Sequence, residues 1–235
     1  SIIEQNQKTL VFFMNQLLPS LFILCVFVQL LPIPNIKTKH NIKLLNIDFT
    51  TLFIIFKMIL LGNPANSYMI HQLFKEKQIS LNQANRLILC ISIPSISFMF
   101  MTLPYLYNHT IAITIFMIHL FTIFLLLFFT RKTSISINIQ LKEISFIQAL
   151  LFSIKTMALI LSYLFVVTSI QSLLLIYFPQ FKFIFDLLIE FSSGTYAFIH
   201  EQNPLFYLLI CIGFGGFCTH LQIISGCDEL KLNYI

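Results

Sequence analysis

Long apolar runs separated by short polar connectors dominate this chain. Apolar residues fill most of residues 10–31, 44–61, 111–129, 144–178 and 205–224. A helix needs about 20 apolar residues to cross the hydrocarbon core of a bilayer, so most of these runs are long enough to span it. The pattern predicts an all-α polytopic membrane protein with roughly five to six spanning helices plus broken or re-entrant segments.

The last apolar run contains an unusual stretch, CIGFGGFCTHLQ at residues 211–222. Its three glycines lower helix propensity and let backbones approach closely, and His220 must find a polar partner or a water-lined cavity at this depth. Two interpretations follow. The stretch is either a tight crossing of two helices or a broken helix that lines a substrate site.

A second irregular patch follows residue 61. Gly62, Asn63 and Pro64 are turn formers, and they end the helical pattern of residues 44–61. Residues 68–78 then alternate apolar and polar positions at helical spacing, which we interpret as a short interfacial helix. Ser80 and Gln83 form a capping box, which predicts the start of the next helix.

A third patch lies at residues 183–195. Residues 183–191 form a short apolar segment that carries Asp186 and Glu190, followed directly by hydroxyl residues and a glycine. This pattern favours a re-entrant hairpin over a full crossing. An ionisable side chain next to a helix break predicts a proton or cation site, or a gating carboxylate, whereas the simpler alternative is an interfacial acid near Lys182.

Two prolines and a lysine modify the predicted helices. Pro19 is expected to kink the first span, and Pro94 interrupts the third beside serines that can satisfy the carbonyls it frees. The run at residues 144–178 is too long for one untilted span, and we expect Lys155 to divide an interfacial start from the span proper.

The distribution of basic residues constrains the topology. If residues 44–61 cross the membrane fully, the lysines at 37, 39 and 43 face outside, against the usual bias of basic loops toward the cytoplasm. If residues 44–61 are re-entrant, these lysines and the loops at residues 75–86 and 131–142 share the cytoplasmic side. We therefore favour re-entrance.

Composition narrows the class of protein further. Hydrophobic residues make up 57% of the 235 and charged residues 10%, with mean hydropathy +0.88, which excludes an ordinary soluble domain. The net charge of +5 falls mainly between the apolar runs, so it reflects topology and not nucleic-acid binding. Five cysteines without a Cys-x-x-Cys pair argue against a disulfide framework.

We expect residues 1–235 to form a single transmembrane domain. Because the chain starts at Ser1 without a methionine, we expect an upstream piece to be missing or trimmed.

The order of these motifs resembles a known family. LLPSLF at residues 17–22, GNPANSYMIHQLFKEKQISLNQANRL at 62–87, EFSSG at 190–194 and GFGGFCTHLQ at 213–222 are similar to motifs of the nucleoside-recognition or gate domain membrane proteins, within them the YlbJ-type sporulation integral membrane proteins. His119 matches a further histidine of that pattern. The chain departs from it at Ile91, Ser92 and Ile93, where the family usually has asparagines and glycine, and at Asn66 and Ser67, where it has Gly-Ala.

The resemblance implies movement of a small polar, anionic solute across a bacterial cytoplasmic membrane, with dipicolinate delivery across the membrane around the forespore as the best-fitting case. A nucleoside-type permease component and a non-transporting scaffold of the spore envelope are the alternatives. The partners implied are the solute, membrane lipid and either a second copy or other membrane subunits. We expect no nucleic acid, no cofactor, no bound metal and no enzymatic activity.

The residues expected to bind the solute are the polar and glycine residues of the irregular patches. They are Asn63, Asn66, Ser67, Ser95, Glu190, Ser192, Ser193, Gly194, Thr195, Gly215, Gly216, His220 and Gln222. For several a structural role is the alternative: His220 and Gln222 can join two helices, the glycines can serve packing or a helix break, and Ser95 can bond its own helix. A zinc site of His220, Cys218 and Glu190 is the enzymatic alternative, although the chain has no His-Glu-x-x-His motif.

Overall fold

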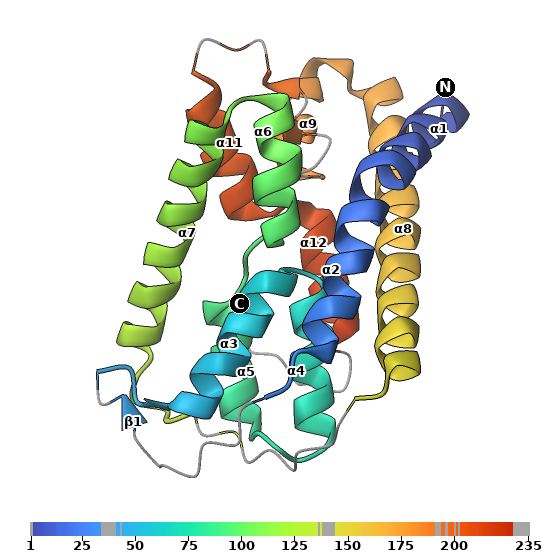
Figure 1. Ribbon diagram of the computed structural model, residues 1–235. Coiled ribbons are helices and arrows are strands. Elements are labelled where there is room, and N and C mark those ends of the chain that lie inside the picture. Colours follow the sequence, from blue (N-terminus) through green and yellow to red (C-terminus); the bar gives the residue numbers. More distant parts are fainter. Residues whose placement is uncertain are drawn as a thin grey trace.

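The computed structural model describes residues 2–33, 41–42, 44–135, 137, 144–190, 194–195, 197–199, 201 and 203–227. Within them the chain is almost entirely helical, and the helices run along a common direction (Figure 1). Two short strands, β1 (Asn41–Ile42) and β2 (Ile47–Asp48), pair antiparallel at one end of the bundle, Asn41 opposite Asp48.

The first span is one continuous rod of three helical pieces. α1 (Ile2–Phe12) passes through a π-helical turn, η1 (Phe13–Leu17), into α2 (Leu18–Leu30). Pro19 lies in the first turn of α2, so the wider turn before it accommodates the hydrogen bond that proline cannot make. The same arrangement recurs where η2 (Phe98–Thr102) precedes Pro104 in α6 (Leu103–Leu106).

A helical hairpin consists of α3 (Phe49–Leu61) and α4 (Ala65–Lys75), and the chain reverses between them at Gly62. We call it the first hairpin. α3 is about 20 Å long, too short to cross the hydrocarbon core, and both helices have their outer ends at the same end of the bundle (Figure 1). The buried Lys57 ties the hairpin to the first span, because its Nζ donates to the carbonyl of Leu31 at 3.1 Å.

The interfacial interpretation of residues 68–78 was wrong. α4 is the returning half of the hairpin, with Met69, Ile70 and Leu73 buried in the bundle. Its polar positions face outward near one end, so the amphipathic pattern reflects packing on protein and not on lipid.

α5 (Leu81–Cys90) begins at the expected capping box, which is confirmed: Ser80 and Gln83 each bond the other's backbone N–H. The chain is non-helical at residues 91–95, and it is helical again from Ile96 through η2 and α6. The span predicted after residue 80 is therefore a broken helix, with the break around Pro94.

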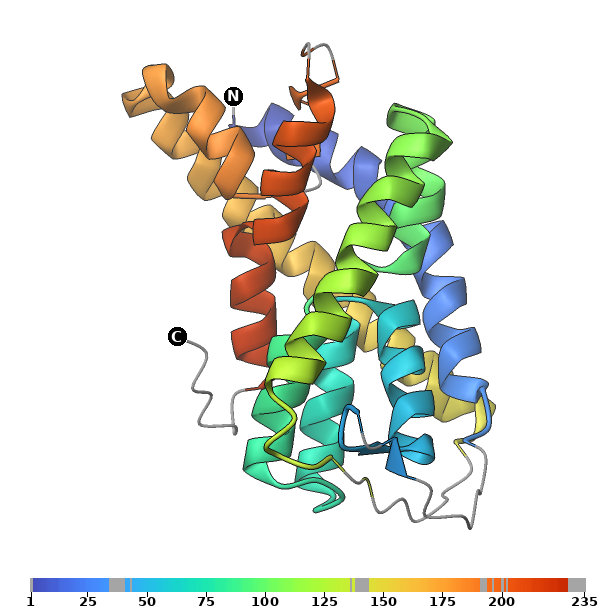
Figure 2. The same cartoon turned by 90° about the vertical axis from the view of Figure 1, so that its left-hand side faces the viewer.

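Two long helices follow. α7 (His109–Phe129) starts at Asn108, whose side chain caps Ile111 N, and α8 (Phe146–Tyr177) starts at a capping box of Ser145 and Gln148. α8 is not divided at Lys155, contrary to the expectation from its length. It is one helix of 32 residues that runs obliquely across the bundle, so its tilt absorbs the excess length (Figure 2).

The last part of the chain contains one short helix and a final, broken span. After η3 (Pro179–Phe181), α9 (Lys182–Leu188) is short. α11 (Pro204–Phe214) and α12 (Gly216–Gly226) form the final span, and it breaks at Gly215 and Gly216, whose φ angles are +77° and +72°. Because L-residues rarely adopt positive φ, glycine is required here, and the predicted break in this helix is present.

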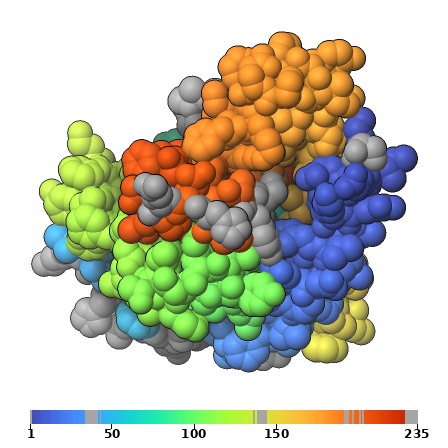
Figure 3. Space-filling model, turned by 90° about the horizontal axis from the view of Figure 1, so that it is seen from above, coloured from blue at the N-terminus to red at the C-terminus, as the bar shows by residue number. Residues whose placement is uncertain are grey.

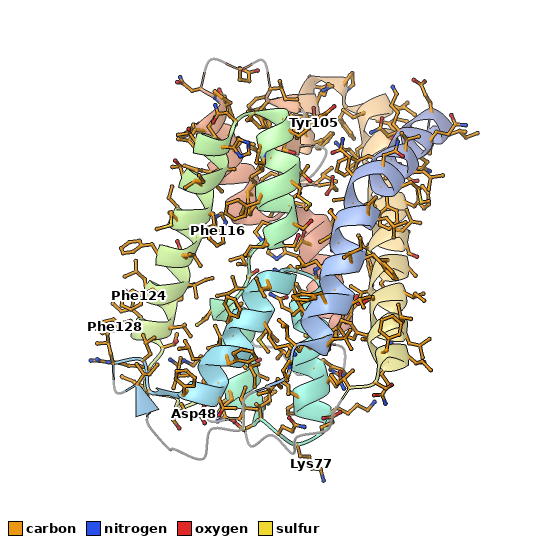
Figure 4. All side chains as sticks on the ribbon, viewed as in Figure 1. Asp48, Lys77, Tyr105, Phe116, Phe124 and Phe128 are labelled. Atoms are coloured by element: carbon orange, nitrogen blue, oxygen red, sulfur yellow. The ribbon has the colours of Figure 1, made fainter. Side chains whose placement is uncertain are left out.

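Four helical segments of the described residues are long and apolar enough to cross a membrane: Ile2–Leu30, His109–Phe129, Phe146–Tyr177 and Pro204–Gly226. The expected total of roughly five to six spans is not confirmed, because α3 is too short and the helix through Pro94 is interrupted. Large apolar side chains remain exposed along these helices, including Phe121 and Phe124 of α7, and Figure 4 shows Phe116, Phe124 and Phe128 along that helix. An all-α integral membrane protein fits this surface.

The elements form two units of the same order and opposite direction. The first unit, residues 2–106, contains a long span, a hairpin and a broken helix. The second unit, residues 146–226, contains α8, α9 with the segment after it, and the broken pair α11 and α12. The first span descends in Figure 1 whereas α8 ascends, and the α3–α4 hairpin and α9 enter from opposite ends. The re-entrant hairpin predicted at residues 183–195 lies partly outside the described residues, because these do not include residues 191–193. We call the end that carries Lys75, Lys77, Arg131 and Lys132 the basic end (Lys77 is labelled there in Figure 4).

Candidate solute cavity

A small cavity lies near the middle of the bundle, where the two units meet. The α3–α4 hairpin, the residue just after α9, both broken helices and both long spans contribute to its wall. The lining residues are Leu17, Leu21, Asn63, Pro64, Ser95, Phe98, Ile160, Leu164, Glu190, Cys218, Thr219 and Gln222. Leu17, Ile160 and Leu164 lie close to the midpoints of their spans, so the cavity is near mid-membrane depth.

The open volume of the cavity is small. About 30 Å³ is open to the centres of water-sized spheres, whereas one water molecule needs roughly 10–15 Å³ on this measure. It therefore holds about two waters, and a larger solute requires the two units to separate.

The tip of the first hairpin is fixed to the broken helix of its own unit. Asn63 N donates to the carbonyl of Ile93 at 2.8 Å, and the Asn66 side-chain amide donates to the carbonyl of Ile91 at 2.5 Å. The Asn63 side chain also donates to Ser92 Oγ at 2.8 Å. The unwound stretch around Pro94 thus has its freed carbonyls satisfied by the hairpin, and not by its serines alone.

Backbone approaches backbone at Gly62. Its φ is +65°, and a Cβ placed there would lie 2.2 Å from Ser95 N and 2.3 Å from Ser95 Cα. No side chain fits this contact. Ser95 itself caps η2 by accepting a hydrogen bond from Phe98 N at 3.2 Å, so the local bond expected of this serine is present and the residue also lines the cavity.

The segment that follows α9 brings Glu190 to the cavity. Glu190 is 3% exposed, and the preceding carbonyl, of Ile189, accepts a hydrogen bond from Cys218 N at 3.0 Å. Gly194 packs tightly, since a Cβ there would lie 2.2 Å from the carbonyl oxygen of Asp186. The carbonyl of Thr195 accepts a hydrogen bond from the Tyr107 hydroxyl.

α12 presents one face to the cavity and another to the helix break. Cys218, Thr219 and Gln222 lie on the cavity face, three and four residues apart. His220 Nε2 instead lies 2.9 Å from the carbonyl oxygen of Phe214, a group that the break leaves without its usual helical partner. His220 therefore caps α11.

The structure brings together four of the residues expected to bind solute: Asn63, Ser95, Glu190 and Gln222. Others have structural contacts and do not line the cavity, namely Asn66, Ser67, Gly194, Thr195, Gly215, Gly216 and His220. Ser192 and Ser193 lie outside the described residues. His119 bonds the carbonyl of Ile115 within its own helix, as expected for a buried and satisfied histidine.

Sequence reasoning missed Thr219 and the apolar walls. Thr219 follows from helical spacing once the break is placed at Gly215, because it is three residues before Gln222. Leu17, Leu21, Ile160 and Leu164 carry no such signal, since cavity-facing and lipid-facing leucines look alike in sequence.

The zinc alternative finds no geometric support in the described part of the chain, where no three His, Cys, Asp or Glu side chains gather closely enough to hold a metal ion. Comparison of the chain with protein-family models, with curated proteins and with solved structures finds no match.

Proposed function

We propose that this protein transports a small polar solute across a membrane and binds it in the cavity between the two units. The observation that supports this proposal is the cavity itself: the tip of the α3–α4 hairpin, the residue Glu190 just after α9, and two broken helices of opposite direction meet there, with Asn63, Ser95, Glu190 and Gln222 in its wall. Inverted units around a mid-membrane polar site are typical of secondary transporters, which alternate access by rocking one unit against the other.

Dipicolinate is the first solute to test, because the motifs at residues 62–87 and 213–222 resemble those of the sporulation membrane proteins. A nucleoside is the second, since carboxylate and amide oxygens in the wall accept hydrogen bonds from a solute rich in N–H and O–H groups. A non-transporting scaffold would move neither.

Uptake into proteoliposomes tests the proposal. Wild-type protein is expected to take up labelled dipicolinate or uridine above empty vesicles, and Glu190→Gln is expected to reduce that uptake. Glu201→Gln is the matched control, because Glu201 is an exposed carboxylate that does not line the cavity. No uptake of either solute, with folded protein in the vesicles, favours the scaffold.

Cysteine labelling provides a second readout in the unaltered chain. Cys218 lines the cavity, whereas Cys25 is buried in the first span away from it. A water-soluble thiol reagent, with modified peptides quantified by mass spectrometry, is expected to label Cys218 more than Cys25. Solute should protect Cys218. Equal labelling of both, unaffected by solute, would contradict a water-reachable binding cavity.

A further inference from the structure

We propose that Asn6, Thr168 and Ser169 form a latch that closes the solute cavity toward the end opposite the basic end, which we call the far end. The cavity opens toward the far end when this latch is released. The inference rests on the proposed transport function, because it names the part of the structure that admits the solute. Three observations carry it: the hydrogen bonds of the latch, its place between the two units, and the closer packing on the other side of the cavity.

Hydrogen bonds between side chains join α1 to α8 at the latch. Asn6 Nδ2 donates to Ser169 Oγ at 2.9 Å, and Asn6 Oδ1 accepts from Thr168 Oγ1 at 3.1 Å and from Ser169 Oγ at 3.2 Å. Such bonds hold apolar helices together in a membrane, where lipid tails offer polar groups no partner. Release of Asn6 therefore frees α1 to move away from α8 at this level.

Thr168 makes the latch reversible. Its hydroxyl carries one proton and has two acceptors within reach, Asn6 Oδ1 on α1 and the carbonyl oxygen of Leu164, 2.7 Å away on its own helix. When Asn6 leaves, the Thr168 hydroxyl keeps a hydrogen bond, so its buried donor stays satisfied. Asn6 is only partly buried, and its amide exchanges the latch for water when α1 moves outward.

The latch lies between the cavity and the far end. Leu164 lines the cavity, and Thr168 follows it by one turn of α8 toward the far end. Asn6 belongs to the first unit, whereas Thr168 and Ser169 belong to the second, so the latch joins the two units that enclose the cavity. Figure 3 shows the far end, where the first span, α6, α11 and the turn between α8 and α9 come together.

A second side-chain bond joins the units on the same side of the cavity. The hydroxyl of Tyr107, directly after α6, donates to the carbonyl of Thr195, in the segment that follows α9. Each of these two links toward the far end depends on one side chain, Asn6 or Tyr107. Rotation of that side chain to another staggered conformation releases the link.

The packing on the other side of the cavity is closer. Gly226 lies one turn beyond Gln222, and Tyr68 lies one turn beyond Pro64, toward the basic end. A Cβ on Gly226 would lie 2.6 Å from Tyr68 Cε1 and 3.0 Å from Ser67 Oγ, so α12 and α4 touch without a gap. Close packing of this kind has no alternative partner to exchange with, so the units rock about it while the latch side opens.

Labelling of Cys218 with a water-soluble thiol reagent measures opening without any solute, because Cys218 lines the cavity. Asn6→Ala is expected to raise the labelling rate by roughly three- to tenfold, since loss of an interhelical hydrogen bond in a membrane shifts an equilibrium by about this factor. Ser169→Ala should raise the rate in the same direction. The double variant should be no faster than Asn6→Ala, because both changes remove the same bonds.

Ser162→Ala is the matched control on the same helix. Ser162 is exposed, and its hydroxyl donates to the carbonyl of Ala158 within α8, so this change should leave Cys218 labelling unaltered. Cys25 is the internal reference, because it is buried in the first span away from the cavity. A latch raises labelling of Cys218 relative to Cys25, whereas general loosening of the helices raises both.

The side of opening is measured in sealed vesicles with a reagent that does not cross the membrane. Lys182→Cys reports the far end and Lys132→Cys reports the basic end, since both lysines are exposed. The faster labelling of Cys218 in Asn6→Ala should occur only from the side that labels Lys182→Cys. Faster labelling only from the side of Lys132→Cys overturns the latch.

The outcomes separate this inference from the transport proposal. Faster Cys218 labelling in Asn6→Ala, without uptake of dipicolinate or uridine by wild type, supports the latch and rejects transport. Uptake by wild type, with Cys218 labelling unchanged in folded Asn6→Ala, overturns the latch and leaves transport standing. An equal rise at Cys25 also overturns the latch. If Asn6→Ala does not fold, Ser169→Ala decides by the same criteria.

Discussion

The two units bring equivalent elements to the cavity but hold the segments that reach it by different means. In the first unit, the polar groups of the tip bond the unwound backbone beside it, at Ile91 and Ile93. In the second unit, the backbone of Ile189 is held by Cys218, and a carboxylate, Glu190, is brought to the wall. The polar groups at the tip of the α3–α4 hairpin thus serve mainly as framework, while the segment after α9 provides the carboxylate. The similarity of the two units therefore does not predict where the charged group of the cavity lies. The positions at which the units differ predict it.

The largest effect is expected at Gly62, where the framework of the first unit is tightest. Gly62→Ala places a Cβ against Ser95 backbone and forces alanine into positive φ, at a cost of about 3 kcal/mol. The melting temperature of the purified protein should fall by roughly 6–12 °C.

The matched control for this substitution is Gly213→Ala. A Cβ at Gly213 meets nothing within 4 Å, and the residue lies inside α11, where alanine favours the helix by about 0.5–1 kcal/mol. Its melting temperature should therefore stay constant or rise. A similar fall in both variants would show that the close approach at Gly62 is not what holds the first hairpin.

The next effect is expected at the base of the first unit, at Arg86. Its buried guanidinium donates to the carbonyls of Leu45, Leu127 and Thr133 and to Thr130 Oγ1, so it ties the base of the hairpin to the end of α7. Arg86→Gln should lower the free energy of unfolding by about 2–3 kcal/mol, because loss of the charged donor leaves several buried carbonyls without a hydrogen bond.

Arg131→Gln is the control for Arg86. Arg131 is exposed and lies 4.5 Å from the ring centre of Phe128, a contact worth about 0.5–1 kcal/mol. Thermal unfolding in detergent measures both variants. Equal losses would argue that general basicity at this end, and not the bonds of Arg86, supports the fold.

Some features of the two units were predictable from the sequence and others were not, depending on the kind of residue. Glycines with positive φ, prolines and capping serines act locally, so the breaks at Gly62 and Gly215 and the helix start at Ser80 were predictable. The destination of α4 was not, because a helix packed on protein and one lying on lipid share the same amphipathic pattern. The predicted division of α8 at Lys155 was wrong for a related reason, because an exposed lysine on a tilted helix does not interrupt that helix.

The site was predictable to the same extent. Polar residues near breaks in apolar runs, such as Asn63 and Glu190, stand out because water-exposed backbone at membrane depth requires a lined cavity. The leucines and isoleucine of the wall do not stand out. Their position depends on the crossing of α2 and α8, which is a tertiary contact without a local signal.

A smaller effect is expected where the two units touch, at Gly226. A Cβ there would lie 2.6 Å from Tyr68 Cε1, so Gly226→Ala pushes α12 from α4 or displaces the ring, at about 1–2 kcal/mol. Tyr68→Ala removes the clash, and alanine at position 226 should then cost less. A double-mutant cycle on unfolding measures the coupling; additive losses would contradict direct contact between the units at this point.

The smallest effect separates two neighbours on α12, one facing the helix break and one facing the cavity. His220→Ala removes the cap on the Phe214 carbonyl and should lower the free energy of unfolding by about 1 kcal/mol. Solute uptake should fall only to the extent that the helix break is disturbed. Gln222→Ala should instead weaken solute binding, because Gln222 lines the cavity. Solute affinity and melting temperature measured on both variants separate the roles. If His220→Ala weakened solute binding at an unchanged melting temperature, the histidine would belong to the binding site and not to the helix junction.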